Sequence, residues 1–177
     1  MQFIQARNYT KGPRTKGAIR LIVIHDMEAP ETKNTAENVA RWFAGSTAPQ
    51  ASAHYCCDND STVQCVRDAD IAWHAPGANA NGIGIELSGY AKQTRTDWLD
   101  PYSKQMLDTQ VIPLVAQLCK LYSIPAVWLL PSQVKAGKKG ICGHIDVTRA
   151  FPERHGSHTD PGPGFPRDYL IKSVKSC

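Results

Sequence analysis

The first clear hydrophobic pattern is a run of apolar, mostly β-branched positions over residues 18–25. Its length and its near-continuous apolarity predict a central β-strand that is covered on both faces. The strand is expected to end at His25, where a polar side chain is well placed to point into a cleft. Residues 1–17 show no comparable pattern and are expected to form an irregular lead-in.

A second strand is predicted over residues 82–89, where large apolar residues alternate with glycine, glutamate and serine. Alternate positions of a strand face opposite sides of a sheet. Glu86 is therefore expected on the face opposite the isoleucines, with small neighbours that leave room for its carboxylate. Glycine within a strand often marks the close approach of another group, and we expect such an approach here.

Helical periodicity appears in three further stretches. Residues 35–44 predict a short helix with Asn34 or Thr35 as its N-cap. Residues 102–122 predict a longer helix that is kinked or restarted at Pro113. Residues 166–174 predict a closing helix that begins with proline.

The remaining elements are short. The pattern predicts a hairpin around residues 58–60, strands over 124–130 and 141–144, and a loop over 131–140. The resulting order, β-α-β-β-β-α-β-β-α, predicts an α/β fold: a single domain over residues 1–177 with a central mixed β-sheet flanked by helices.

The composition is that of one globular domain, since 177 residues contain 42% hydrophobic and 20% charged positions. The net charge of +4 favours polyanionic surroundings such as cell-wall polymers. No basic stripe with interleaved aromatic residues occurs, which argues against a nucleic-acid partner. No stretch is apolar enough for an export signal or membrane insertion, so we expect synthesis in the cytoplasm. The six cysteines have irregular spacing, which favours buried free thiols.

Candidate chemistry is concentrated in the Gly- and Pro-rich segment 143–164. It contains His144, His155, His158 and Asp160, and histidine with carboxylate is the ligand set of catalytic zinc sites. His25 is a distant partner at a strand end, although the spacing leaves His54 and His74 equally open as ligands. A carboxylate near such a metal can act as a general base, and Glu86 is the isolated candidate on a strand.

Six short strings resemble, in the same order, those of the zinc-dependent N-acetylmuramoyl-L-alanine amidases, the family that includes phage endolysins, anhydromuramyl-peptide amidases and peptidoglycan recognition proteins. The resemblance runs from about Ile19 to Phe165. The strings are Ile-Val-Ile-His25, Ser52-Ala-His-Tyr, Ala72-Trp-His-Ala-Pro-Gly, Asn81-Gly-Ile-Gly-Ile-Glu-Leu, Gly143-His-Ile-Asp and His158-Thr-Asp-Pro-Gly-Pro-Gly-Phe.

The resemblance implies one Zn²⁺ per chain, bound by His25, His144 and Asp160. It implies that Glu86 is the general base and that the reaction cleaves the amide between N-acetylmuramic acid and L-alanine. His158 stands where many members have a lysine that stabilises the oxyanion. This histidine should make activity more sensitive to pH, because an unperturbed imidazole has a pKa near about 6.5.

The resemblance also places Trp73 and His74 in a substrate cleft. Asn81 is expected either to contact the stem peptide as a third substrate-binding residue or to fix its loop. Where some phage members have a catalytic tyrosine, this chain has Ala53, and Tyr55 is expected on the other side of the strand. Asp146 is expected to anchor its loop, whereas His155 is expected to face solvent.

The favoured function is that of a monomeric phage endolysin that cuts the peptidoglycan of the host wall after holin-mediated release. The domain is also expected to occur within larger endolysins. One alternative is a cytosolic amidase that recycles soluble muropeptides. Another is a peptidoglycan-binding module without catalysis, which the presence of all three expected ligands and Glu86 argues against.

Overall fold

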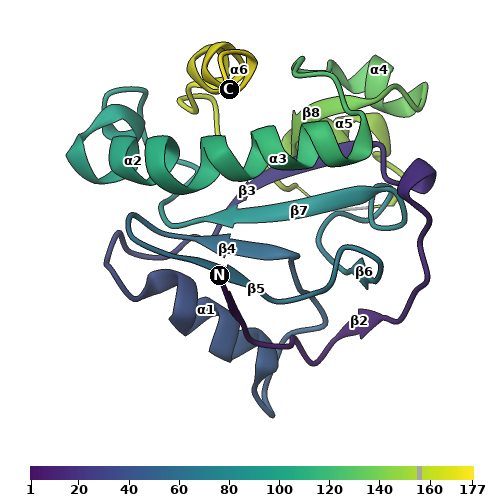
Figure 1. Ribbon diagram of the computed structural model, residues 1–177, viewed down its shortest axis with the longest axis horizontal. Coiled ribbons are helices and arrows are strands. Elements are labelled where there is room, and N and C mark those ends of the chain that lie inside the picture. The colour runs from purple at the N-terminus through teal and green to yellow at the C-terminus, as the bar shows by residue number, and fades with distance from the viewer. Residues whose placement is uncertain (155–156) are drawn as a thin grey trace.

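A six-stranded mixed sheet forms the centre of the computed structural model, which describes residues 1–154 and 157–177. The strand order is β1-β5-β4-β7-β3-β8, and the run β4-β7-β3-β8 is parallel (Figure 1). β5 is antiparallel to β4, and β1 is parallel to β5. The strands are β1 (Gln2–Phe3), β3 (Leu21–Asp26), β4 (Tyr55–Cys57), β5 (Thr62–Gln64), β7 (Gly82–Leu87) and β8 (Gly140–Gly143).

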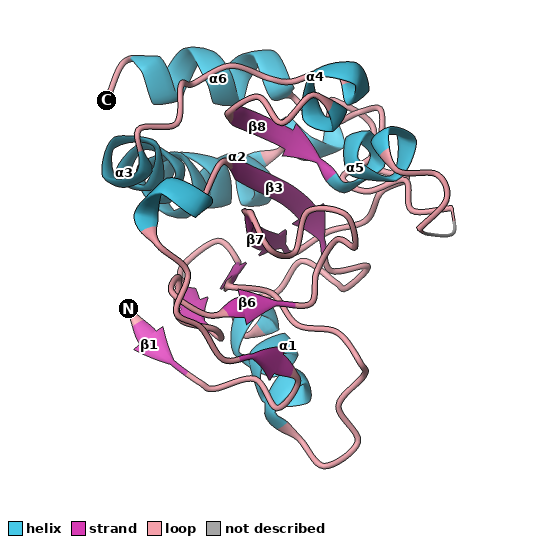
Figure 2. Ribbon diagram, turned by 90° about the vertical axis from the view of Figure 1, so that its right-hand side faces the viewer, coloured by secondary structure: helices cyan, strands magenta, loops and turns pink. Residues whose placement is uncertain are grey.

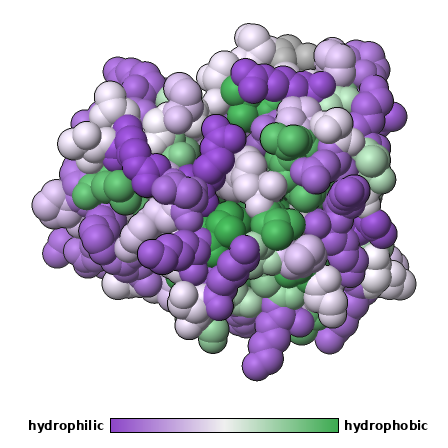
Figure 3. Space-filling view, turned by 90° about the horizontal axis from the view of Figure 1, so that it is seen from above, coloured by the Kyte–Doolittle hydropathy of each residue, from purple (hydrophilic) through white to green (hydrophobic). Residues whose placement is uncertain are grey.

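Most of the apolar core lies on one face of this sheet. Ile83, Ile85 and Leu87 of β7 are buried there, as their alternation predicts, and they pack with the long helical layer. That layer contains α2 (Pro101–Met106), a π-helical segment (Leu107–Val111), α3 (Ile112–Tyr122) and α6 (Arg167–Lys175), and it lies above the sheet in Figure 1. Seen from above, its outer surface is largely hydrophilic, with apolar side chains in small separate groups (Figure 3).

The opposite face of the sheet is covered at its two ends. At the β4–β5 end, α1 (Thr35–Ala44) packs through Ala36, Ala40 and Phe43. At the β8 end, α4 (Pro131–Lys135) and α5 (His144–Ala150) contribute Val134 and Val147 to a separate apolar cluster. Figure 2 shows α1 and α5 well apart on either side of the central strands. The polar face of β3 and β7 lies between these two clusters.

Several predicted elements need correction. Residues 124–130 do not form a strand; only an isolated bridge joins Trp128 to Ile141, because the N–H of Val127 donates to the carbonyl of Pro125 in a local turn instead of extending the ladder. The expected loop over 131–140 contains α4, which begins at Pro131. The strand predicted over 141–144 ends at Gly143, and His144 begins α5, a helix that sequence periodicity did not reveal.

The lead-in is not wholly irregular. β1 adds to the main sheet, and β2 (Tyr9–Thr10) pairs with β6 (Ile71–Ala72) in a small antiparallel sheet. Strands of two residues are too short to produce a periodic signal. The helical layer continues past Pro113, because this proline lies in the first turn of α3, where an N–H is not required. Ser123, with a left-handed φ of 51°, follows its end.

The cysteines have the free thiol form that their irregular spacing favours. All six cysteines are free, and Cys56, Cys57, Cys65 and Cys142 are buried. Among the described residues, no helix combines the length and the apolarity needed to cross a membrane.

The N-terminus of α1 is capped from a distant turn. The helix has the predicted bounds and Asn34 at its N-cap position, but that side chain makes no capping bond. Instead the buried carboxylate of Asp58 accepts from the backbone N–H of Ala36 at 3.0 Å. Its other oxygen accepts from the N–H and the hydroxyl of Ser61 in the hairpin turn, at 2.9 and 3.0 Å. One carboxylate thus joins α1 to the β4–β5 hairpin.

We predict that Asp58→Ala lowers the free energy of unfolding by about 2–3 kcal/mol, because it removes the acceptor of the buried N–H of Ala36 and of the partly buried N–H of Ser61. Urea denaturation measures the change. Asp60→Ala removes an exposed carboxylate of the same turn and should change stability by less than about 0.5 kcal/mol. Equal effects of the two substitutions would contradict the assigned cap.

Candidate metal centre and active site

The candidate site lies at the carboxyl ends of three parallel strands. His25 of β3 is the register partner of Glu86 of β7, so both side chains leave the same face of the sheet. On the other side of β3, Gly143 of β8 pairs with Ile24, and His144 follows directly. This arrangement places three polar side chains at one sheet edge, the usual position of sites in α/β folds.

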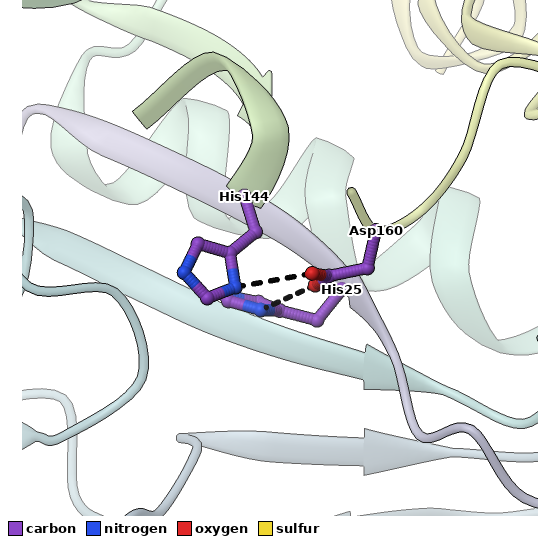
Figure 4. Close-up of side chains that lie close together, drawn as sticks. All are labelled: His25, His144 and Asp160. Carbon is purple, nitrogen blue, oxygen red and sulfur yellow. Dashed lines mark hydrogen bonds and ion pairs between the residues drawn. The ribbon is translucent and has the colours of Figure 1, made fainter. Parts of the chain in front are cut away.

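Asp160 completes the cluster from the loop between α5 and α6. Its carboxylate lies between the two imidazoles, with Oδ2 3.0 Å from Nδ1 of His25 and Oδ1 3.2 Å from Nδ1 of His144 (Figure 4). The three side chains come from different elements and point toward one another. The structure therefore brings together the three expected ligands, and it does not include His54 in this group.

Close backbone packing fixes the loop that presents Asp160. Its carbonyl accepts from the N–H of Ile145 at 3.0 Å, near the start of α5. Gly162 has a φ of +82°, and a Cβ there would meet the carbonyl oxygen of Ala91 at 1.9 Å. A Cβ at Gly143 would meet the ring of Pro161 at 2.7 Å. Glycine is required at both positions for the loop to reach the sheet edge.

The charges of the cluster perturb one another. Burial, followed by repulsion from Asp160 and Asp26, raises the pKa of Glu86 well above its usual value. Burial and the neighbouring Asp160 likewise raise the pKa of Asp26 to about 7. Burial alone would also raise the pKa of Asp160, but the hydrogen bonds from His144 and His25 outweigh it and hold that pKa below its usual value. Burial lowers the pKa of His25.

Glu86 is adjacent to the three candidate ligands but makes no hydrogen bond to them. Its Oε1 lies 4.0 Å from Nδ1 of His25, and its Oε2 is buried without a hydrogen-bond partner. A buried carboxylate oxygen without a partner is costly. This cost would be offset if a bound water beside the metal site donated a hydrogen bond to Oε2 of Glu86.

A cavity of about 360 Å³ opens over this cluster. Its wall includes Trp73 and His74, two of the three expected substrate-binding residues, but not Asn81. The carbonyl of Asn81 instead accepts from the N–H of Leu21 at 3.1 Å and positions the start of β3. Trp73 is half-buried, and its indole N–H donates to the hydroxyl of Thr10 at 2.9 Å.

His158 also lines the cavity. Its side chain is 50% exposed, its ring stacks on His144 with centroids 4.1 Å apart, and its Nδ1 is 3.9 Å from Oδ1 of Asp160. It therefore borders the cluster on the solvent side. His155, expected to face solvent, lies outside the described residues.

Two further expectations concern residues near the ligands. Oδ2 of Asp146 accepts from the N–H of Gly143 at 2.9 Å and from the indole of Trp128 at 3.1 Å, so Asp146 anchors the start of α5, as expected. The Tyr55 hydroxyl donates to Asp68 at 2.7 Å and is not part of the cavity wall.

Sequence reasoning missed part of the cavity wall. Asp26 and Met27, directly after His25, line it, as does Trp42 of α1. Trp42 and Phe43 are adjacent aromatic residues of α1; Phe43 is buried, whereas Trp42 is 53% exposed. Adjacent residues of a helix point in different directions. Two adjacent aromatic residues therefore indicated that one of them, here Trp42, lies on the exposed wall of the cavity.

Comparison with known proteins decides the family. The profile of the amidase type 2 family, described as N-acetylmuramoyl-L-alanine amidase, matches residues 15–163. The chain belongs to this N-acetylmuramoyl-L-alanine amidase family. It is accordingly an amidase with a buried His/His/Asp candidate metal site, and peptidoglycan is the substrate that the family implies.

Solved structures confirm the amidase fold. A mutant of PlyL matches with a TM-score of 0.65 and 16% identity, covering 100% of this chain and 99% of that one. The hydrolase AmiA of Staphylococcus aureus matches with a TM-score of 0.68 and 14% identity, covering 98% and 80%. An AmpD derivative matches with a TM-score of 0.64 and 23% identity, covering 98% and 93%. No curated protein matches the sequence.

The donor set of this amidase fits zinc. Two imidazoles and a carboxylate are a usual catalytic ligand set, and donors about 2.1 Å from a tetrahedral ion lie about 3.4 Å apart. The observed separations of 3.0 and 3.2 Å are close to that value. All three ligand atoms lie within 4.8 Å of one another.

We predict about one zinc per chain and at least an approximately hundredfold loss of zinc affinity in Asp160→Ala, because the carboxylate between the two imidazoles is removed. Metal analysis and competition with a chelator measure both. Glu28→Gln is the matched control: Glu28 lines the cavity but lies outside the cluster, and glutamine keeps the acceptor for the Ala91 N–H. Retention of full zinc affinity by Asp160→Ala would contradict the assigned centre.

Proposed function

We propose that this amidase is a zinc-dependent endolysin that cleaves the amide between N-acetylmuramic acid and L-alanine in intact cell walls. The observation that supports this mechanism most directly is the buried Oε2 of Glu86, which has no hydrogen-bond partner and lies beside the His25, His144 and Asp160 cluster in the cavity wall. A zinc ion held by these three residues would supply a Lewis acid that activates water and polarises the scissile carbonyl.

Glu86 is the proposed general base. A base must lie near the attacking water and must be able to take up its proton. Burial and the carboxylates of Asp160 and Asp26 favour the protonated form of Glu86, so it has a strong tendency to accept a proton. The same proton can then pass to the nitrogen of the departing L-alanine. Its position in register with His25 keeps this carboxylate beside the ligands.

His158 is the proposed donor to the developing oxyanion. Its ring stacks on His144 at the solvent side of the cluster, so it can face a carbonyl oxygen that enters the cavity. Trp73 and His74 form part of the cavity wall and are the proposed contacts for the muramyl peptide. Asn81 is proposed to act indirectly, through the start of β3.

Two observations favour an intact wall as the substrate. The exposed Trp42 lies on the wall of the cavity, where an extended polymer can contact it. The net charge of +4 favours anionic cell-wall polymers. Proteins with similar folds include a mutant endolysin from Bacillus subtilis. AmpD has a similar fold as well, and a recycling amidase remains the second candidate.

We predict that digestion of purified cell walls creates new L-alanine N-termini and leaves the glycan strands unbroken. Mass spectrometry of the products measures this, and new reducing sugar ends would instead identify a glycosidase. A parallel digestion of soluble muropeptides separates the two candidates. Cleavage of the soluble fragments alone would contradict the endolysin role while leaving the amidase activity established.

Glu86→Gln should retain zinc but lower kcat by about 10²–10⁴-fold, because an amide cannot accept the proton of the attacking water. Steady-state kinetics on a muramyl peptide and metal analysis of the same sample measure the two effects. Glu28→Gln, which alters another carboxylate of the cavity wall, serves again as the control. A fully active Glu86→Gln enzyme would remove Glu86 from the base role.

His158→Ala should lower kcat by about 10²-fold, in the range found for the loss of one oxyanion donor. His158→Lys should restore most of the rate and extend activity to higher pH, because lysine stays protonated where imidazole does not. The measurement is kcat against pH for the three proteins. An unchanged rate in His158→Ala would place the donor elsewhere.

A further inference from the structure

The ring of His74 lies directly on the backbone of β7. A Cβ at Gly84 would be 2.5 Å from Cγ of His74, and a Cβ at Gly82 would be 3.2 Å from its Cε1. Gly84 is therefore required for the ring to reach this position, and a side chain at Gly82 would crowd the ring. His74 is the group whose close approach the glycines of this strand indicated.

The segment around His74 is held from a second direction. The side-chain oxygen of Asn79 accepts from the backbone N–H groups of His74 and Ala75, at 3.0 and 2.7 Å. His54 contacts the same strand, β7: its Nδ1 accepts from the N–H of Gly84 at 3.0 Å. The His54 and His74 rings are 5.6 Å apart, in an edge-on arrangement. The position of the His74 ring is thus fixed by the turn and by the sheet.

The His74 ring contacts the proposed metal ligand His25 on the side of its ring that faces away from Asp160. Nδ1 of His74 is 3.1 Å from Nε2 of His25, while Nδ1 of His25 faces Asp160. Both histidines are buried, and burying a charged ring is unfavourable, which favours neutral rings. Each neutral ring has one N–H, so in this bond one ring donates and the other accepts.

The direction of this bond depends on which nitrogen of His25 has the proton. Without a metal, the Asp160 carboxylate favours the proton on Nδ1 of His25; Nε2 of His25 then accepts from Nδ1–H of His74. When Nδ1 of His25 binds a metal, its lone pair must be free, and the proton must be on Nε2. That N–H then donates to Nδ1 of His74, whose own proton must move to Nε2, a buried atom with no hydrogen-bond partner among the described residues.

We propose that His74 is a positioning residue for the metal ligand His25, and that it changes from hydrogen-bond donor to acceptor when the metal binds. The proton balance is complete: one proton leaves Nδ1 of His25, one passes from His74 to Nε2 of His25, and one is taken up at Nε2 of His74. An imidazole can serve as donor or acceptor, so the His25 ring keeps its partner and its orientation in both states. This inference rests on the proposed zinc site.

Imidazole ¹⁵N NMR of the wild-type protein tests the change directly. In the metal-free protein we expect His25 and His74 both to have their protons on Nδ1. In the zinc-bound protein we expect both protons on Nε2. A His74 tautomer that is the same in both states would overturn the inference. A wild-type protein that binds no zinc would instead overturn the proposed function, so the two failures are distinguishable.

Three variants test the positioning role through zinc affinity. His74→Leu should weaken zinc binding about 10–100-fold, as is usual when the outer partner of a ligating histidine is lost. His74→Gln should recover most of this loss, since its amide can donate or accept. Gly84→Ala should resemble His74→Leu although His74 is present, because the added Cβ displaces the ring.

Gly140→Ala is the matched control for the glycine variant. It adds a Cβ of equal size to β8, the parallel strand on the other side of β3, against the buried side chain of Leu129 at 2.6 Å and away from His74. It should change zinc affinity by less than about twofold. Zinc affinity that is unchanged in both His74→Leu and Gly84→Ala would overturn the positioning role. If a variant does not fold, the wild-type tautomers still decide the question.

Discussion

The parallel register of β3 with β7 is the constraint on which the site depends. It places His25 beside Glu86 on one face of the sheet, while Ile24 and Ile85 face the core. Side chains alternate with a period of two, so a slip of one residue would turn a ligand or the carboxylate into the apolar layer. The same apolar alternation that buries the sheet against α3 therefore also fixes the chemistry on its other face.

The site remains polar because two separate apolar clusters, and not one continuous layer, cover the face of the sheet that holds His25 and Glu86. α1 closes one end of the face and α5 closes the other, and the imidazoles and carboxylates lie between them. Burial of these groups is unfavourable unless they are paired. Asp160 is paired with two imidazoles, and its pKa falls accordingly. Glu86 makes no such hydrogen bond, and its pKa rises. One environment thus gives two carboxylates opposite tendencies to bind a proton, which suits the proposed metal ligand and the proposed base respectively.

Glycine determines how closely the parts of the site approach. Gly162 allows the Asp160 loop to lie against the backbone at Ala91, and Gly84 allows the His74 ring to lie on β7. In both cases a side-chain atom would occupy space that is already filled. Such positions contribute to the site without contacting a substrate.

The sequence by itself determined the α/β class, the bounds of α1, the face of β7 that holds Glu86, and a set of histidines and carboxylates suited to zinc. These features depend on local periodicity and on residue type. The choice of His25, rather than His54, beside His144 and Asp160 came from family resemblance, because separations of 119 and 16 residues impose no contact. Only the tertiary structure decided that His54 and His74 lie behind the ligands, that Asp58 caps α1, and that Trp42 lines the cavity. Those outcomes depend on strand register and on contacts between distant segments, which no local pattern records.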